Sequence, residues 1–98
     1  MMTKSAVVTV RAKPGKEKEL KNTLSKFVIP SRNESGCIDY HILQSFEDPN
    51  MFIGFMIYEN EEAFRRHEAS EMIQHFVKTV APELLEDQPN FKDWRDLG

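Results

Sequence analysis

A small group of side chains near the middle of the chain could take part in acid–base chemistry, and His67 is the foremost of them. A histidine with its ordinary pKa of about 6.5 accepts a proton near neutral pH with little tuning. Tyr40, Tyr58 and Glu59 precede it in the sequence. Phenols and a carboxylate that line a pocket would orient a hydroxylated aromatic ligand. The simpler alternatives are a histidine satisfied by one hydrogen bond, core tyrosines, and an acid that closes a strand.

Other common catalytic patterns are absent from the sequence. It has no G-x-S-x-G, no glycine-rich phosphate loop and no C-x-x-C. The remaining histidines, His41 and His75, complete no ligand set with His67, so we expect no metal. Cys37 is either a reactive thiol or, more simply, a small packing residue.

Composition points to one globular domain spanning residues 1–98. The 40% hydrophobic content argues against disorder, and the net charge of −3 comes from acids and bases mixed along the chain. No basic stripe indicates nucleic acid, and no apolar run is long enough to cross a membrane. One cysteine cannot form a disulfide within the chain, so we expect a cytoplasmic protein.

A hairpin forms the predicted centre of the fold. Residues 37–46 and 51–58 are rich in β-branched and aromatic side chains, and the turn residues Glu47, Asp48, Pro49 and Asn50 separate them. One face of the first strand is predicted to be apolar, with Ile38, Tyr40, Ile42 and Phe46. Both faces of the second strand are apolar, which is typical of a strand covered on both sides.

Further elements flank this hairpin. We predict a strand over residues 5–12, a helix over residues 16–28 that Pro30 ends, and a polar loop over residues 31–36. Asn60 is the expected N-cap of a short helix that carries Ala63, Phe64 and His67 on one face. Ser70 is expected to cap a second helical segment after a break, and residues 90–95 form the last strand. The buried residues of that second segment are expected to be Met72, Ile73, Phe76, Val77 and Val80.

The order strand, helix, strand, strand, helix, strand predicts an α+β, ferredoxin-like sandwich. Such a fold has a four-stranded antiparallel sheet with its helices on one face. The other face would be bare and apolar, which implies a partner. The simplest partner is a second copy of the chain, so we expect a homodimer.

The motifs of the hairpin and the following helix resemble the antibiotic biosynthesis monooxygenase family. The resemblance includes E-S-G-C-I-x-Y-x-I-x-Q-S at residues 34–45, E-D-P-N-x-F at residues 47–52, Y-E-N at residues 58–60 and F-x-x-H-x-x-S at residues 64–70. The Lys13-Pro14-Gly15 turn and Leu20 match the family's first turn and helix. The similarity covers roughly residues 7–80 and is nearest to the small quinol monooxygenase group.

This resemblance implies a dimeric α+β barrel with a pocket between sheet and helices in each subunit. It also implies oxidation of a quinol-like or phenolic molecule by O₂ without a cofactor. In this interpretation His67 is the base, and Tyr40 and Glu59 orient the substrate. The apolar slot would comprise Phe52, Phe55, Met56, Phe64 and Phe76.

Two alternatives remain open at this stage. One is an isomerase, or a related enzyme, that acts on a small carbonyl metabolite with or without a phosphate group. Arg11, Arg32 and Arg65 are the available anion-binding groups for it. The other is a non-catalytic dimeric ligand-binding module. Haem degradation is disfavoured for two reasons. The haem-degrading branch carries tryptophan at the position of His67, and its haem-ligating histidine corresponds to a position near Val77, with which His75 is out of register.

Overall fold

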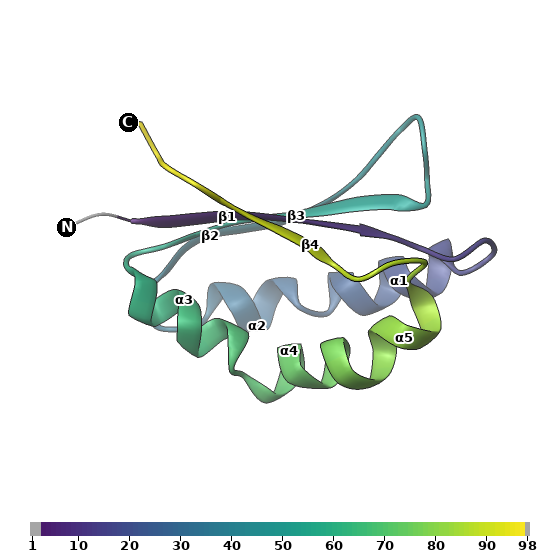
Figure 1. The fold of residues 1–98 in the computed structure, drawn as a ribbon. Helices are drawn as coiled ribbons and strands as arrows, with labels where there is room; N and C mark the ends of the chain where they lie inside the picture. The colour runs from purple at the N-terminus through teal and green to yellow at the C-terminus, as the bar shows by residue number, and fades with distance from the viewer. Residues whose placement is uncertain (1–2, 98) are drawn as a thin grey trace.

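One antiparallel sheet and a layer of helices make up the structure (Figure 1). A computed structural model describes residues 3–97 of the 98-residue chain. The strands are β1 (Lys4–Arg11), β2 (Cys37–Gln44), β3 (Met51–Tyr58) and β4 (Asn90–Trp94), and they lie in the order β2-β3-β1-β4. Figure 1 shows every helix on the same side of this sheet. The ferredoxin-like α+β prediction is therefore confirmed.

The helices fall into two groups along the chain. The first comprises α1 (Glu17–Ser25) and α2 (Val28–Arg32), between β1 and β2. The second comprises α3 (Glu61–Glu68), α4 (Glu71–His75), a π-helical segment η1 (Phe76–Val80) and α5 (Ala81–Leu84), between β3 and β4. Leu20 and Leu24 of α1 and Phe76 of η1 are buried, so both groups contribute to one core.

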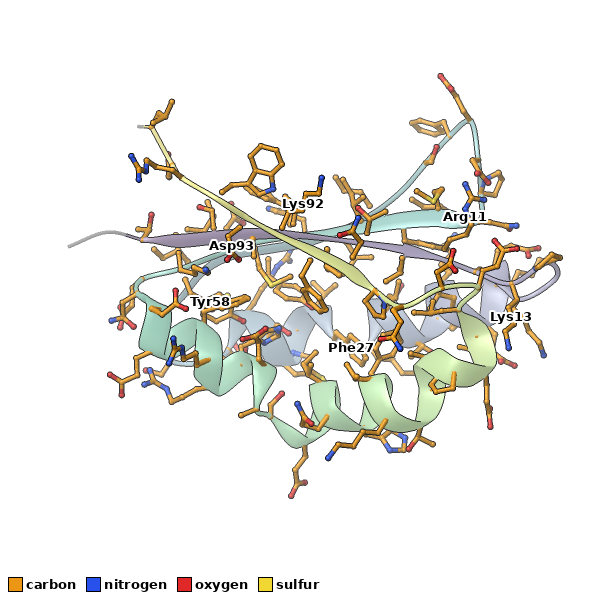
Figure 2. The ribbon with its side chains drawn as sticks, viewed as in Figure 1. Arg11, Lys13, Phe27, Tyr58, Lys92 and Asp93 are labelled. Carbon is orange, nitrogen blue, oxygen red and sulfur yellow. The ribbon has the colours of Figure 1, made fainter. Side chains whose placement is uncertain are left out.

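The hairpin forms as predicted. β2 pairs with β3 in an antiparallel ladder, and β3 is buried at every second residue from Phe52 to Tyr58. The buried positions face the helices, and the intermediate ones lie on the other face. That bare face carries Leu43, Ile53, Phe55 and Ile57 of the hairpin, and Figure 2 shows Lys92 of β4 on the same side of the sheet.

Two residues of the predicted apolar face of β2 lie elsewhere. The ladder shifts register between Cys37 and Asp39, so Ile38 falls in an irregular stretch and is 58% exposed. Phe46 lies beyond the end of β2 and is fully exposed. Tyr40 and Ile42 alone keep the inward orientation.

The prediction that Pro30 ends the first helix is wrong. α1 already ends at Ser25, and Pro30 is the third residue of the separate helix α2. The first N–H groups of a helix have no intrahelical acceptor, so proline is tolerated there. Ser31 and Arg32, which we assigned to a loop, therefore belong to this helix.

The second helical group begins as predicted and then departs from α-helical periodicity. The Asn60 and Ser70 side chains accept hydrogen bonds from the N–H groups of Ala63 and Ile73, which confirms both caps. The wider π-helical turns of η1 then change the register of the faces. Phe76 is buried, but Val77, which we expected in the core, is 38% exposed.

Candidate active site: a histidine–glutamate pair beside an apolar cavity

A cavity of about 180 Å³ lies between the sheet and the helices. Its floor comes from the strands, through residues such as Val8, Tyr40 and Met56, and its roof from Phe27 and Phe76. Figure 2 shows Phe27 on the helix side of the sheet. The lining also includes His67, Glu68 and Gln74, but it is otherwise nearly all apolar.

His67 is held at this cavity by the short helix α3. The Asn60 side chain caps the helix at 2.8 Å from the Ala63 N–H and so fixes where it begins. Two turns later His67 is only 4% exposed, and its ring contacts those of Tyr40 and Tyr58 at centroid distances of 5.5 and 5.2 Å. The imidazole is thus packed in place by aromatic rings.

Glu34 is the polar partner of this histidine. Its Oε1 lies 2.7 Å from His67 Nδ1, and the same oxygen accepts a 2.6 Å hydrogen bond from the Tyr58 hydroxyl. A carboxylate accepts hydrogen bonds, so the short contact places the proton on Nδ1. The two donors together anchor the Glu34 side chain.

The other ring nitrogen of His67 is available to a ligand. Nε2 has no hydrogen bond to another described residue. It also retains some solvent-accessible surface, because it is not one of the fully buried polar atoms without a hydrogen-bond partner. His67 lines the cavity, and Nε2 is its ring nitrogen without a hydrogen bond to residues 3–97. With the proton on Nδ1, a neutral imidazole presents its lone pair there. That arrangement suits proton abstraction from a bound hydroxyl.

Both tyrosines near the histidine stay protonated. Burial and then the hydrogen bond to Glu34 raise the pKa of the Tyr58 phenol far above its ordinary value. Burial also raises the pKa of the Tyr40 phenol, and the nearby Ser31 hydroxyl offsets part of this increase. Ser31 Oγ is fully buried and has no well-formed hydrogen bond within residues 3–97. Of the two tyrosines, Tyr40 lines the cavity, whereas Tyr58 lies outside the lining and donates its hydrogen bond to Glu34.

Gly36 sets the path of the chain that carries Glu34. It adopts φ +85°, in the left-handed region, and its carbonyl accepts a hydrogen bond from the Glu59 N–H at 2.8 Å. A Cβ at this position would lie 2.6 Å from the Ala63 Cβ on α3. Glycine thus lets the loop before β2 approach α3 closely enough for Glu34 to reach His67.

The structure brings some of the predicted site residues together and leaves others apart. His67, Tyr40, Met56, Phe64 and Phe76 all line the cavity. Phe52 is buried in the core beyond the lining, Phe55 stacks on His41 on the bare face of the sheet, and Glu59 is exposed.

Sequence reasoning missed Glu34 as a functional residue. The carboxylate on the histidine is Glu34, and Glu59 makes no such contact. The distance between Glu34 and His67 in the sequence gave no periodic signal. The one available clue was that Glu34 opens the E-S-G-C run of the family motif.

No metal-binding or membrane-spanning feature occurs in the part of the chain that the structure describes. Within residues 3–97, no three histidine, cysteine, aspartate or glutamate side chains cluster in a way that would hold a metal ion. In the same range, every helix is too short or too polar to cross a bilayer.

The fold and the site together define a class: a ferredoxin-like α+β protein with an apolar cavity and a buried histidine paired with a partly buried carboxylate. Residues 5–79 match the antibiotic biosynthesis monooxygenase family. The chain belongs to this family, as its motifs had suggested.

Similar proteins of known structure support the fold assignment. A Shewanella oneidensis protein shares 27% identity with a TM-score of 0.93, over 97% of this chain and 91% of its own. A Pseudomonas aeruginosa protein shares 26% identity with a TM-score of 0.91, over 100% of this chain and 97% of its own. A candidate antibiotic biosynthesis monooxygenase from Nitrosomonas europaea, at 21% identity, has a TM-score of 0.89 over 98% of this chain and 91% of its own.

A curated relative extends beyond the matched region. An uncharacterised Synechocystis protein is 29% identical over 86 residues, which make up 88% of this chain. The match spans 58% of the length of that relative.

Proposed function

We propose that this protein binds a neutral phenol or quinol in its cavity and oxygenates it with O₂, with His67 as the general base. The observation that carries the proposal is the Glu34–His67 pair: the 2.7 Å contact engages Nδ1 of a histidine that lines an apolar cavity, and Nε2 has no hydrogen bond to the described residues. Family membership supports a monooxygenase-like or small-molecule-binding role in general. The quinol-type substrate and the use of O₂ are our proposal.

The reaction needs little from the protein beyond a base and a dry slot. His67 Nε2 removes the proton from a substrate hydroxyl, and the electron-rich anion then reduces O₂. For a hydroquinone, one oxygen atom enters the ring to give a hydroxyquinone and the other leaves as water, with four electrons passing from the ring to O₂. Tyr40 lines the cavity, and in this proposal its protonated hydroxyl donates a hydrogen bond to the developing anion.

Charge around the cavity favours a neutral ligand. No lysine or arginine of residues 3–97 lines it. The three arginines considered for an anionic substrate are engaged elsewhere: Arg11 pairs with Asp48, Arg32 donates to the Tyr40 carbonyl, and Arg65 pairs with Glu61. An isomerase acting on a phosphorylated metabolite would lack a cation at the site.

We also propose that the protein acts as a homodimer. The bare face of the sheet carries the partly exposed apolar side chains Leu43, Ile53, Phe55 and Ile57, and Trp94 at the edge is 57% exposed. Apolar surface of this kind is usually covered. Analytical ultracentrifugation at micromolar concentration would detect the dimer, and a stable monomer would refute it. We further propose a cytoplasmic location, because a single cysteine cannot form a disulfide within the chain.

Oxygen uptake with a series of reduced quinols tests the catalytic proposal. Purified protein should accelerate uptake above the autoxidation rate of free quinol. His67→Ala should lower that acceleration by about a hundredfold or more, the usual effect of losing a positioned base. Tyr40→Phe should have a smaller effect.

His75→Ala is the matched control, because His75 is an exposed histidine outside the cavity lining. This variant should retain the wild-type rate. Absence of any acceleration across the quinol series would refute the oxygenase and leave a ligand-binding module. Full activity in His67→Ala would retain the enzyme but refute the assigned base.

A further inference from the structure

One row of residues across the sheet has an unusual composition. The strand registers align Ile42 of β2, Gly54 of β3, Val8 of β1 and Phe91 of β4. All four residues line the cavity. Gly54 is the only member of the row without a side chain, and it occupies the strand between Ile42 and Val8.

The neighbouring rows on this face are filled at the β3 position. Met56 pairs with Tyr40 and Ala6 on one side, and Phe52 pairs with Gln44 and Val10 on the other. Met56 and Phe52 are both buried. Of these three rows, only the Gly54 row has a β3 position that adds no side chain to this face, and all of its members line the cavity.

A side chain at position 54 would enter this space. A Cβ built there would lie 2.8 Å from Val8 Cγ1 and 3.5 Å from both Ile42 Cδ1 and Met56 Cε. The contact with Val8 is too short, so one of the two side chains would have to shift. Gly54 has no positive φ, hence its role is spatial and not conformational.

The size of the space selects the ligand. An apolar cavity of about 150 Å³ accommodates benzene. The cavity here is about 180 Å³, and Phe27 and Phe76 meet edge to face at 5.3 Å in its wall. It therefore holds one six-membered ring with small substituents, and a fused second ring would have to protrude or displace wall residues.

We propose that Gly54 determines ligand size and that the ligand is a neutral monocyclic phenol or hydroquinone with its hydroxyl at His67. This inference rests on the proposed function for the chemistry of the hydroxyl group. The size limit itself depends only on the geometry of the Val8–Gly54–Ile42 row.

Binding of p-cresol and 2-naphthol, followed by titration calorimetry or NMR, tests this inference without any oxidation step. Wild-type protein should bind p-cresol at least tenfold more tightly, although 2-naphthol is the more hydrophobic compound. Gly54→Ala should weaken p-cresol binding at least tenfold. Val8→Ala enlarges the same slot and should reduce the preference for p-cresol at least fivefold.

The double variant Val8→Ala/Gly54→Ala removes the 2.8 Å clash and should recover p-cresol binding relative to Gly54→Ala. If Gly54→Ala does not fold, this double variant and Val8→Ala alone still decide the question. Val7→Ala is the control, because it makes the same change to β1 outside the cavity lining and should leave both affinities unchanged.

The outcomes separate this inference from the proposed function. Comparable affinity for the two compounds in wild type, or a preference that Val8→Ala does not alter, would overturn the size limit. Selective binding of p-cresol without oxygen uptake on any monocyclic quinol would support the size limit and refute the oxygenase. Rapid oxidation of a two-ring quinol would support the oxygenase and refute the size limit.

Discussion

Replacing Gly36 by alanine should destabilise the protein much more than the same change at Gly15. Both glycines have nearly the same positive φ, +85° and +83°. A Cβ at Gly15 would meet nothing within 4 Å, whereas one at Gly36 would lie 2.6 Å from the Ala63 Cβ. Gly15→Ala therefore measures the cost of the left-handed conformation alone, about 1–2 kcal/mol.

Gly36→Ala adds the cost of overpacking against α3, about 1–3 kcal/mol. With an additional ~2 kcal/mol, the Tm of Gly36→Ala should be about 8–16 °C below that of Gly15→Ala. Thermal and urea denaturation would measure both free energies of unfolding. The displacement should also separate Glu34 from His67, so catalytic activity should fall in Gly36→Ala and not in Gly15→Ala.

Ala63→Gly provides an internal test, because it removes the atom that the new Cβ would meet. In a double-mutant cycle, Gly36→Ala and Ala63→Gly should show a favourable coupling of about 1 kcal/mol or more. If the Gly15→Ala and Gly36→Ala variants melt alike, the close approach of this loop to α3 is not what the structure indicates.

Three further predictions concern the same region. Gly36→Val should lower the Tm more than Cys37→Ser, because valine adds β-branching to the clash and Cys37 is half-buried beside the Asp39 carbonyl; equal melting would contradict this. Glu34→Gln should lower oxygenation about a hundredfold at unchanged fold, since an amide can donate to Nδ1 and favour the wrong tautomer; an unaltered rate would refute the role of Glu34. Tyr58→Phe should cost about 1–2 kcal/mol by urea denaturation. That cost should be constant from pH 6 to 9, since the raised pKa keeps the folded-state phenol protonated, and it should shrink only as pH rises above about 10, where the unfolded phenol ionises.

The regular parts of the fold were predictable because they follow local rules. Alternating apolar residues and the Asp48–Asn50 turn gave the hairpin, and it forms with the expected strands. Asn60 and Ser70 were recognisable caps because each is a polar residue directly before an apolar periodic run. The element order then left the ferredoxin-like sandwich as the simplest arrangement.

The polar centre of the site was only partly predictable. His67 and Tyr40 could be selected by residue type, but the carboxylate partner depends on a tertiary contact between α3 and the loop before β2. Glu59 lies nearer to His67 in the sequence than Glu34 does, but it is exposed and does not line the cavity. Only the fold determines that Glu34 is the acid that reaches Nδ1.

The shape of the cavity was not predictable from sequence patterns. Gly54 looks like a weak point in an apolar strand, and its meaning depends on its alignment with Val8 and Ile42 across three strands. The π-helical turn that exposes Val77 likewise departs from the 3.6-residue periodicity used to predict the core.

A structure of the protein with a bound monocyclic phenol tests the central claim most directly. The account predicts the ring over Gly54 and the phenolic oxygen within about 2.6–3.2 Å of His67 Nε2, the distance required for proton transfer. The Glu34 contact to Nδ1 should persist in that complex. A phenol bound elsewhere, or one whose hydroxyl points away from His67, would contradict the account.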